Sequence, residues 1–401
     1  MKGSLAGVRV LDLSRILAGP TCTQLLGDLG ADVIKVERPG HGDDTRRWGP
    51  PFVKKADGTD SDESAYYLCA NRNKRSIAVD FRSGEGSALI RRMAKKCHVL
   101  VENYRTGSLE KYGLGYEDLR DEAPHLVYCS ISGFGRTGPR KDQPGYDFLA
   151  QAMAGTMSLT GEPAGEPVKV GVGIGDVMCG MYATSAVLAA LRHAERTGEG
   201  QHVDLALYDA TVAWLINAAT NTLVTGNAPK RYGNAHPNIV PYQVFETSDG
   251  HVVIAVGNDG QFQALCAALG EALHEDERFL TNADRLRHRD ALIAAIVAVT
   301  KTRTTDDWID ALVAAGVPCG PVNDLPAVFD EPQTKARGMV ISMAHAYGEV
   351  KLLGNPLNLS ATPVRYRRPP PLRGEHTNEV LKELGETSSA IEKWRRDGVV
   401  E

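Results

Sequence analysis

The chain has 401 residues, more than the roughly 250–300 at which single hydrophobic cores stop growing, so we expect two domains or one domain with a large insertion. Hydrophobic residues make up 42% and charged residues 24%, which is ordinary for a globular protein and excludes a disordered chain. The net charge of -5 comes from mixed acidic and basic residues without a basic stripe, which excludes nucleic acid and an anionic membrane as partners.

The first residues and the cysteines indicate a cytoplasmic protein. A strand pattern begins within the first ten residues, and neither a signal peptide nor a run of about 20 apolar residues is evident. The seven cysteines form no CxxC pair and mostly lie in apolar segments, which is typical of reduced core thiols. We expect Cys179 to pack rather than react, and we expect no metal site, because no second ligand stands near His236 at metal-ligand spacing.

Strand and helix patterns alternate through the first half of the chain. Six β-branched, apolar segments are separated by segments with helical spacing, which predicts an α/β fold with a parallel sheet covered on both faces. The predicted strands are residues 8–13, 32–36, 76–80, 98–102, 126–132 and 201–206. The main predicted helices are residues 21–29, 84–96, 146–154, 177–192 and 210–224.

Basic and amide residues follow the carboxyl ends of these strands. Arg38 comes just after the second strand, and similar residues lie at 71–75, at Arg82, at 102–105 and at Lys111. Open parallel sheets bind ligands at this edge, so the set suits a ligand with several phosphates, although each residue alone is typical of plain surface. Neither the GxGxxG fingerprint of dinucleotide sites nor a GxxxxGK[ST] P-loop is present.

The composition changes after residue 225, where a second domain is expected. Residues 226–241, rich in Gly, Pro and Asn, predict a linker or active-site loop, and residues 242–330 predict a smaller α+β domain. Residues 331–401 hold too few elements for a core of their own. We therefore expect them to return to the large domain that residues 1–225 begin.

The segment VGVGIGDVMCGMYA, residues 170–183, places Asp176 where a helix is predicted to begin. One interpretation is an N-cap, in which Asp176 accepts hydrogen bonds from the first N–H groups of the helix. The other is a nucleophile, for which the neighbouring glycines leave room for a substrate and offer N–H groups to an oxyanion. This segment by itself favours the cap, because Asp is common at that position.

Eight sequence blocks, taken in order, cover the chain from end to end. They are LAGP, GADVIKVERPG, NRNKRSIAVD, VENYRTGSLEKYGLGYEDL, GYDFLAQAMAG, the segment around Asp176, GVPCGPV and LRGEHTNEVLKELG. Together they resemble the class III CoA-transferases, the family of formyl-CoA transferase and the carnitine CoA-transferases, and within it the succinate:hydroxymethylglutarate group most closely. The resemblance implies a Rossmann-like large α/β domain, an inserted smaller α+β domain and an interlocked homodimer.

The resemblance also implies that Asp176 is the catalytic nucleophile and that the reaction passes through a covalent aspartyl-CoA thioester. Coenzyme A and acyl-CoA would be substrates, with no tightly bound cofactor. Lys111 stands where formyl-CoA transferase has Arg, Pro144 where it has Lys, and Leu17 where it has Gln. The implied CoA-binding residues are Leu17, Ala18, Arg38, Val79, Arg82, Asn103, Tyr104, Arg105, Lys111, Tyr146 and Asp147.

For the acid, the resemblance implies CoA transfer from succinyl-CoA to a dicarboxylic acid such as glutarate or hydroxymethylglutarate. The second carboxylate would need a cation or a donor in a site poor in water. The candidates are Arg46, Arg47 and Trp48 in DDTRRW, and Asn234 with His236 in the loop 226–241. The alternative interpretation is that the arginines are exposed surface and that His236 packs within its loop.

An α-methylacyl-CoA racemase of the same superfamily is the alternative function. Racemases of that kind carry a His, in AGHD, as a base for α-proton exchange, whereas this chain has Tyr146 in PGYD. A phenol is a poor base at neutral pH, because its ordinary pKa is about 10. The residue at this position therefore favours the CoA-transferase.

Overall fold

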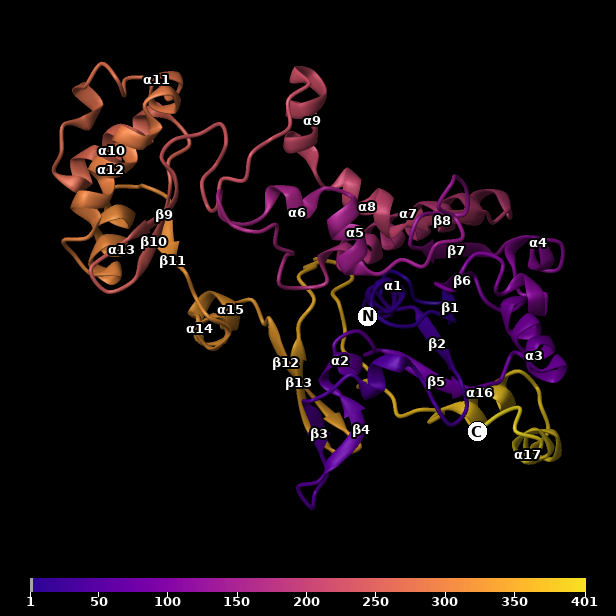
Figure 1. Cartoon of the computed structure of the whole chain (residues 1–401). Helices are drawn as coiled ribbons and strands as arrows, with labels where there is room; N and C mark the ends of the chain where they lie inside the picture. The colour runs from indigo at the N-terminus through magenta and orange to yellow at the C-terminus, as the bar shows by residue number, and fades with distance from the viewer. Residues whose placement is uncertain (1–2) are drawn as a thin grey trace. The chain divides into compact units, whose positions relative to one another are not determined.

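The computed structural model describes residues 3–401, which form two compact units (Figure 1). Of the described residues, the first unit comprises 3–156, Lys169–Thr220 and Gln333–Glu401. The second comprises Met157–Val168 and Asn221–Pro332. Each unit has its own hydrophobic core.

The first unit is built on a six-stranded sheet in which every neighbouring pair is parallel, which confirms the predicted α/β class. Across the sheet the strands are β5 (Lys74–Ala78), β2 (Asp32–Glu37), β1 (Arg9–Asp12), β6 (Val99–Glu102), β7 (Val127–Ser132) and β8 (His202–Ala206). The strand order reverses between β1 and β6. Ligands of open parallel sheets bind at such a switch point, outside the carboxyl ends of the strands.

Successive strand residues point to opposite faces of this sheet, so Val10 and Leu11 belong to different cores. Helices α1 (Ala18–Asp28) and α7 (Ile174–Thr197) supply residues to the core that contains Val10. The core that contains Leu11 includes residues of α3 (Gly84–Ala94), α16 (Thr377–Glu383) and α17 (Ser388–Arg396). The C-terminal segment therefore completes one covering layer of the sheet.

Two antiparallel hairpins and several short helices complete the first unit. The hairpins are β3 (Phe52–Lys54) with β4 (Asp60–Ser64), and β12 (Val340–His345) with β13 (Gly348–Leu353). The sequence analysis missed β4, because its sequence DSDES has no apolar alternation. The short helices are η1 (Asp44–Arg47), α2 (Ala65–Leu68), η2 (Glu110–Tyr112), α4 (Tyr116–Leu119), α5 (Asp147–Met153) and α8 (Leu207–Ala213), whereas α6 (Thr156–Leu159) begins at the boundary and continues in the second unit.

The second unit is a small α+β structure around an antiparallel three-stranded sheet. The sheet holds β9 (Tyr242–Glu246), β10 (His251–Ala255) and β11 (Cys319–Pro321). Its helices are α10 (Asp259–Leu269), η3 (Leu273–Glu275), α11 (Asn282–Arg287), α12 (Arg289–Thr300), α13 (Thr305–Ala314) and α14 (Leu325–Asp330), with α15 (Pro332–Ala336) at the boundary. Trp308 and Phe262 are fully buried in its core.

Residues 157–168 belong to this second unit, although the sequence analysis placed them in the large domain. Hydrogen bonds to the backbone of this segment explain the difference: the Arg231 side chain donates from Nε to Glu162 O at 3.1 Å, and the Gly233 N–H donates to Gly161 O at 3.2 Å. Such long-range pairings of loop backbone carry no signal in residue type.

Two helices differ from their predicted bounds. The segment predicted as one helix over 210–224 forms α8 and α9 (Ile216–Thr225), and the φ of Ile216 is 31°, outside the helical region. Helix α7 begins at Ile174 rather than at Val177. By length and composition it is the one helix among the described residues that could cross a membrane, which was not predicted from the sequence. Its buried face packs on α1 and the sheet, as core helices do.

Candidate active site

Asp176 lies in the first turn of α7, and the N-cap of this helix is Gly173, so the N-cap interpretation of Asp176 is wrong. The capping group is Asp147 of α5. Its Oδ1 accepts hydrogen bonds from the N–H groups of Gly175 (2.7 Å) and Asp176 (3.4 Å). Within residues 3–401, no side chain or backbone group donates a hydrogen bond to the Asp176 carboxylate. The carboxylate is therefore available to a reactant.

Gly175, directly before Asp176, has a packing role that the sequence did not predict. The Gly175 N–H already donates to Asp147, so the expectation that it serves an oxyanion is not supported. A Cβ at Gly175 would lie 3.0 Å from Asp147 Oδ1 and 3.2 Å from Thr211 Oγ1. The missing side chain thus lets Asp147 reach the start of α7.

The surroundings of Asp176 favour its neutral form. Burial, and after it the charge of Asp147, raise the pKa of the Asp176 carboxyl to about 7. Burial and then the charge of Asp176 raise the pKa of Tyr66 to about 12. A carboxylate with a raised pKa is a better nucleophile once it is ionised, and pKa values near neutrality are common among functional groups.

A cavity of about 420 Å³, which we call the Asp176 cavity, lies beside this carboxylate. Its cations are Arg15, Arg105 and Lys141. No ion pair joins Arg105 or Lys141 to an acidic residue within the described chain. The other side chains and glycines that line it are Ile16, Ala18, Asp44, Trp48, Asn103, Tyr104, Thr106, Ile131, Ser132, Gly133, Gln143, Pro144, Gly145, Tyr146 and Leu207.

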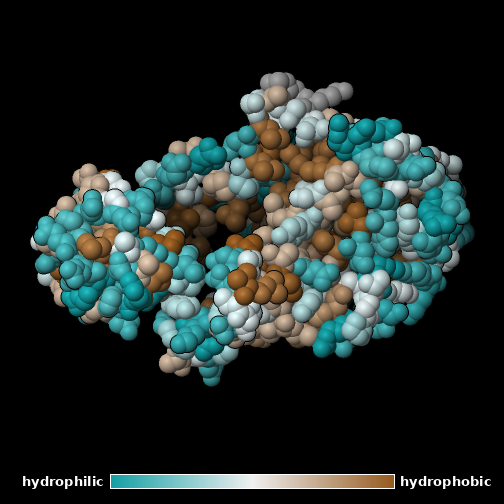
Figure 2. Space-filling view, turned by 90° about the horizontal axis from the view of Figure 1, so that it is seen from above, coloured by the Kyte–Doolittle hydropathy of each residue, from teal (hydrophilic) through white to brown (hydrophobic). Residues whose placement is uncertain are grey.

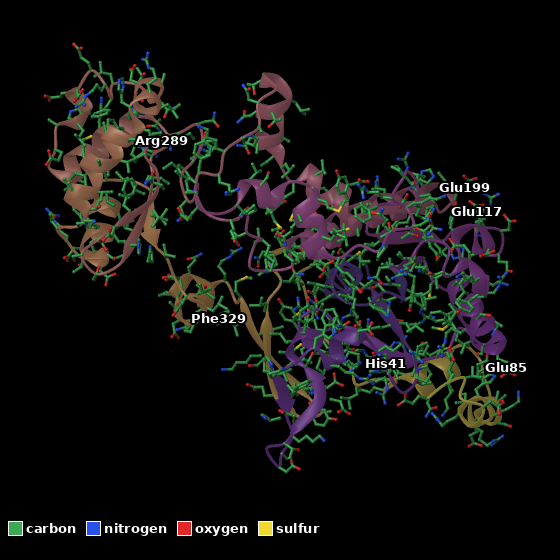
Figure 3. All side chains as sticks on the ribbon, in the orientation of Figure 1. His41, Glu85, Glu117, Glu199, Arg289 and Phe329 are labelled. Carbon is green, nitrogen blue, oxygen red and sulfur yellow. The ribbon has the colours of Figure 1, made fainter. Side chains whose placement is uncertain are left out.

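A second cavity, of about 300 Å³, opens at the carboxyl ends of β2 and β5, and we call it the Arg38 cavity. His41, labelled in Figure 3, is among its lining residues. Arg82 is engaged with Asp80 at 2.7 Å, whereas Arg38 and Lys111 have no acidic partner among the described residues. Both of these side chains are exposed, so the cavity offers free positive charge to an anion.

Arg15, Asp44 and Tyr104 line both cavities and so mark their junction. Arg15 and Asp44 were not predicted from the sequence as site residues. Arg15 follows the carboxyl end of β1, so the rule that singled out Arg38 also applies to it. Asp44 carries no such signal, because it reaches the junction through the 3-10 helix η1, whose position depends on buried ion pairs.

One such pair joins Lys35 Nζ to Asp43 Oδ2 at 2.8 Å, and both side chains are fully buried. Lys35 also donates to Ser14 O at 2.9 Å, which ties the loop after β1 to the end of β2. Beneath the same loop, Lys74 Nζ lies 3.0 Å from Asp12 Oδ2. Breaking a buried pair leaves an uncompensated charge, so these contacts hold the loops in one arrangement.

The predicted CoA-binding residues fall into three groups. The Arg38 cavity is lined by Arg38, Val79, Arg82, Tyr104 and Lys111, and the Asp176 cavity by Ala18, Asn103, Tyr104, Arg105 and Tyr146. Leu17 and Asp147 line neither cavity but flank Asp176, since a Cβ at Gly173 would lie 3.3 Å from Leu17 Cδ2 and 3.7 Å from Asp147 Cγ. The structure therefore brings this predicted set together around one pair of cavities.

The predicted acid-binding arginines need correction. Arg46 is buried with 3% exposure, and its guanidinium pairs with Glu37 (2.7 Å) and Glu63 (2.5 Å). An arginine held by two buried carboxylates cannot offer its charge to a substrate. Arg47 is exposed and lines a different cavity, with Asp60 and Asp62, not the one beside Asp176.

Trp48 does line the Asp176 cavity. Its ring packs edge-to-face on Tyr66, with 5.2 Å between the ring centroids. Tyr66 was not anticipated from the sequence, because it lies in a short helix after the missed strand β4. Together these two rings form an aromatic wall close to Asp176.

Asn234 and His236 belong to the second unit. His236 is held within its own loop: its Nδ1 accepts from the Asn238 N–H at 3.0 Å, and Arg289 (labelled in Figure 3) donates to His236 O at 2.8 Å. Burial and the charge of Arg289 lower the pKa of His236, so the imidazole is neutral at physiological pH. Asn234 is exposed.

Comparison with known proteins adds to this geometry. The family model of CoA-transferase family III matches residues 5–377. A succinate–glutarate CoA-transferase of Agrobacterium fabrum is 49% identical, over 96% of this chain and 96% of the relative. A succinyl-CoA:glutarate CoA-transferase of Homo sapiens is 45% identical, over 95% of this chain and 86% of the relative. A crystal structure of a CAIB/BAIF family protein from Brucella suis has 48% identity and a TM-score of 0.86, with coverage of 96% of this chain and 100% of that one.

Proposed function

Since the chain belongs to CoA-transferase family III, we propose that this enzyme moves CoA from succinyl-CoA to a dicarboxylic acid such as glutarate or hydroxymethylglutarate, through a covalent thioester at Asp176. The observation that carries the proposal is the Asp176 carboxylate, which is capped by no donor and stands in a cavity that meets a second, cationic cavity. Coenzyme A is a substrate in this proposal, and no tightly bound cofactor is required.

The reaction needs only acyl transfer at one carboxylate. Asp176 attacks the thioester carbonyl of succinyl-CoA, giving a mixed anhydride and CoA thiolate. The thiolate attacks the Asp176 carbonyl and releases succinate, which leaves an aspartyl-CoA thioester. The acceptor carboxylate then attacks this thioester, and the released thiolate attacks the acceptor carbonyl of the new anhydride, which frees Asp176 and the product acyl-CoA.

The two cavities suit the two parts of CoA. In the proposal, Arg38 and Lys111 of the Arg38 cavity pair with its phosphates, since neither cation has an acidic partner. The thioester then lies in the Asp176 cavity, beside Leu17 and the aromatic side chains of Trp48 and Tyr66. Apolar and aromatic walls limit access of water, which would hydrolyse the covalent intermediate.

Trapping of the covalent intermediate tests the mechanism. We expect succinyl-CoA without an acceptor to release about one succinate per active site and to add the mass of CoA less one water to a peptide containing Asp176. Asp176→Asn should show no adduct and no transfer, while binding of free CoA persists. Mass spectrometry of the digested protein measures the adduct, and a label on any other peptide would refute the role of Asp176.

The distal carboxylate of the acid requires a cation near Asp176. We propose Lys141 and Arg105 for this role, because they line the Asp176 cavity and have no acidic partner among the described residues. Lys141→Gln should lower kcat/KM for glutarate by about 10–100-fold and leave kcat/KM for butyrate within about twofold. Lys382→Gln, an exposed lysine of α16 that lines neither cavity, is the control. An equal loss for both acids would show that Lys141 does not read the second carboxylate.

The racemase alternative gains no support from the geometry. The residue in place of the racemase His is Tyr146, whose side chain is 64% exposed, and the adjacent Asp147 is engaged in capping α7. Neither group is a base held against the α-carbon of a bound acyl-CoA.

We further propose a cytoplasmic, interlocked homodimer in which the second unit is an inserted domain. Helices α5, α7 and α8 pack together and expose large apolar side chains, including Phe148, Leu149, Met181, Tyr182 and Val212. Figure 2 views the molecule from above, relative to the orientation of Figure 1, and shows hydrophobic residues exposed among hydrophilic ones. Exposed apolar surface of this kind is typical of interfaces. Sedimentation equilibrium should give twice the chain mass, and a monomer would contradict the proposal.

A further inference from the structure

Arg15 and Asp44 form an ion pair at the junction of the Arg38 and Asp176 cavities. Arg15 Nη1 lies 2.7 Å from Asp44 Oδ2, and the guanidinium carbon lies 4.9 Å from the centre of the Tyr104 ring. The two charged side chains are 40% and 32% exposed. Ion pairs with this exposure contribute little to folding stability, so the contact is easily exchanged for another.

The backbone that carries Arg15 is held firmly, in contrast to its side chain. The Asn103 amide donates to Arg15 O at 2.7 Å and accepts from the Arg15 N–H at 2.8 Å. The next residue, Ile16, has a φ of 69°, which is costly for a β-branched side chain. Strained backbone of this kind persists where the surroundings enforce it, and it clusters at ligand sites.

One donor of the Arg15 guanidinium lacks a hydrogen-bond acceptor in this arrangement. Arg15 Nε is buried and no described group accepts a hydrogen bond from it. A buried donor without an acceptor is costly, because it has lost water and gained nothing. A small rotation of the side chain away from Asp44 would expose the edge formed by Nε and Nη2, and this edge binds phosphate or carboxylate oxygens in pairs.

We propose that Arg15 is a CoA-binding residue whose guanidinium gives up its contact with Asp44 and pairs with the diphosphate of CoA. Asp44 therefore competes with the ligand for one guanidinium. The inference rests on the proposed function, because CoA must extend from the Arg38 cavity to Asp176. The diphosphate is the charged group between the two ends of CoA, and Arg15 is the cation that lines both cavities at their junction. A bidentate guanidinium fits it better than any neutral part of the pantetheine arm.

Calorimetric titration of the full-length protein with free CoA tests the competition. Arg15→Gln should weaken CoA binding by about 10–100-fold, the usual effect of losing a charge-assisted contact. Asp44→Asn should tighten it by about two- to fivefold, because the competing carboxylate is gone. In the Arg15→Gln background, Asp44→Asn should have no further effect. With succinyl-pantetheine, which lacks the diphosphate, kcat/KM of Arg15→Gln should stay within about twofold of the wild type.

The matched controls are Arg120→Gln and Glu117→Gln, an exposed pair with a 2.8 Å contact outside both cavities. Weaker CoA binding by Asp44→Asn would show that the pair is purely structural and would overturn the inference. So would a loss of kcat/KM in Arg15→Gln that is as large with succinyl-pantetheine as with succinyl-CoA. If Arg15→Gln fails to fold, Arg15→Lys replaces it, and unchanged CoA affinity in that variant would also overturn it. A wild type that binds no CoA refutes the proposed function itself, whereas unchanged variants of a CoA-binding wild type refute only the role of Arg15.

Discussion

Asp147, from another helix, caps α7 in place of Asp176, which leaves the Asp176 carboxylate free for its proposed role as the nucleophile. The same neighbour sets the electrostatics of the site, since its charge adds to burial in raising the pKa of the Asp176 carboxyl to about 7. Asp147 thus has two effects: it accepts hydrogen bonds from the N-terminus of α7, and it keeps a fraction of the Asp176 carboxyl groups protonated near neutral pH.

The pH dependence of the reaction follows from this arrangement. Asp176 attacks only when ionised, so kcat/KM for succinyl-CoA should rise with pH through about 7 and then level off. Asp147→Asn keeps an acceptor for the cap but removes the charge, so the rise should move to lower pH. Initial rates measured between pH 5 and about 9 test both expectations.

Glu162→Gln changes another carboxylate, one that belongs to the second unit, and serves as the control for Asp147→Asn. Its pH profile should match that of the wild type. A profile of Asp147→Asn that stays in place, or that moves to higher pH, would contradict the proposed coupling between the two aspartates.

At the scale of elements, the site depends on the close packing of α7 against α1. Gly180→Ala would place a Cβ 2.7 Å from Ala18 O and 2.9 Å from Thr21 Cβ. Overpacking of this kind costs about 1–3 kcal/mol, against about 1 kcal/mol that Ala gains over Gly in a helix, so we expect a net loss of up to about 2 kcal/mol. Urea unfolding measures the difference.

Gly84→Ala is the matched helical control, because nothing lies within 4 Å of a Cβ at that position in α3. It should leave the free energy of unfolding unchanged or slightly higher. If Gly180→Ala were equally harmless, the two helices would not be in the close contact described.

At the scale of the whole molecule, the two units have separate cores, and this predicts separate unfolding transitions. Leu265 is fully buried in the core of the second unit, so Leu265→Ala should cost that unit about 2–5 kcal/mol. Calorimetry of the full chain should show a lower midpoint temperature for one unfolding transition and an unchanged midpoint temperature for the other. Val313→Ala, at a position 62% exposed in the same unit, should change neither. A single transition that moves as a whole would indicate that the units unfold together.

The sequence by itself determined the α/β class and the parallel strands, whereas the role of Asp176 as nucleophile follows from the family resemblance and stays a prediction. Strands such as β1 and β6 are buried on both faces, so they are nearly continuous apolar segments, and periodicity identifies them within one or two residues. The family resemblance rests on blocks of local sequence, which is why Asp176 and most of the residues around the two cavities were found without a structure.

Only the tertiary structure decided which charges are free. Arg46 and Arg47 are adjacent and alike in sequence, yet one is buried between Glu37 and Glu63 and the other is exposed. The cap of α7 and the junction at Arg15 likewise depend on partners far away in the sequence. Residue type and spacing report what a side chain can do, whereas its availability is set by the long-range partners that burial brings to it.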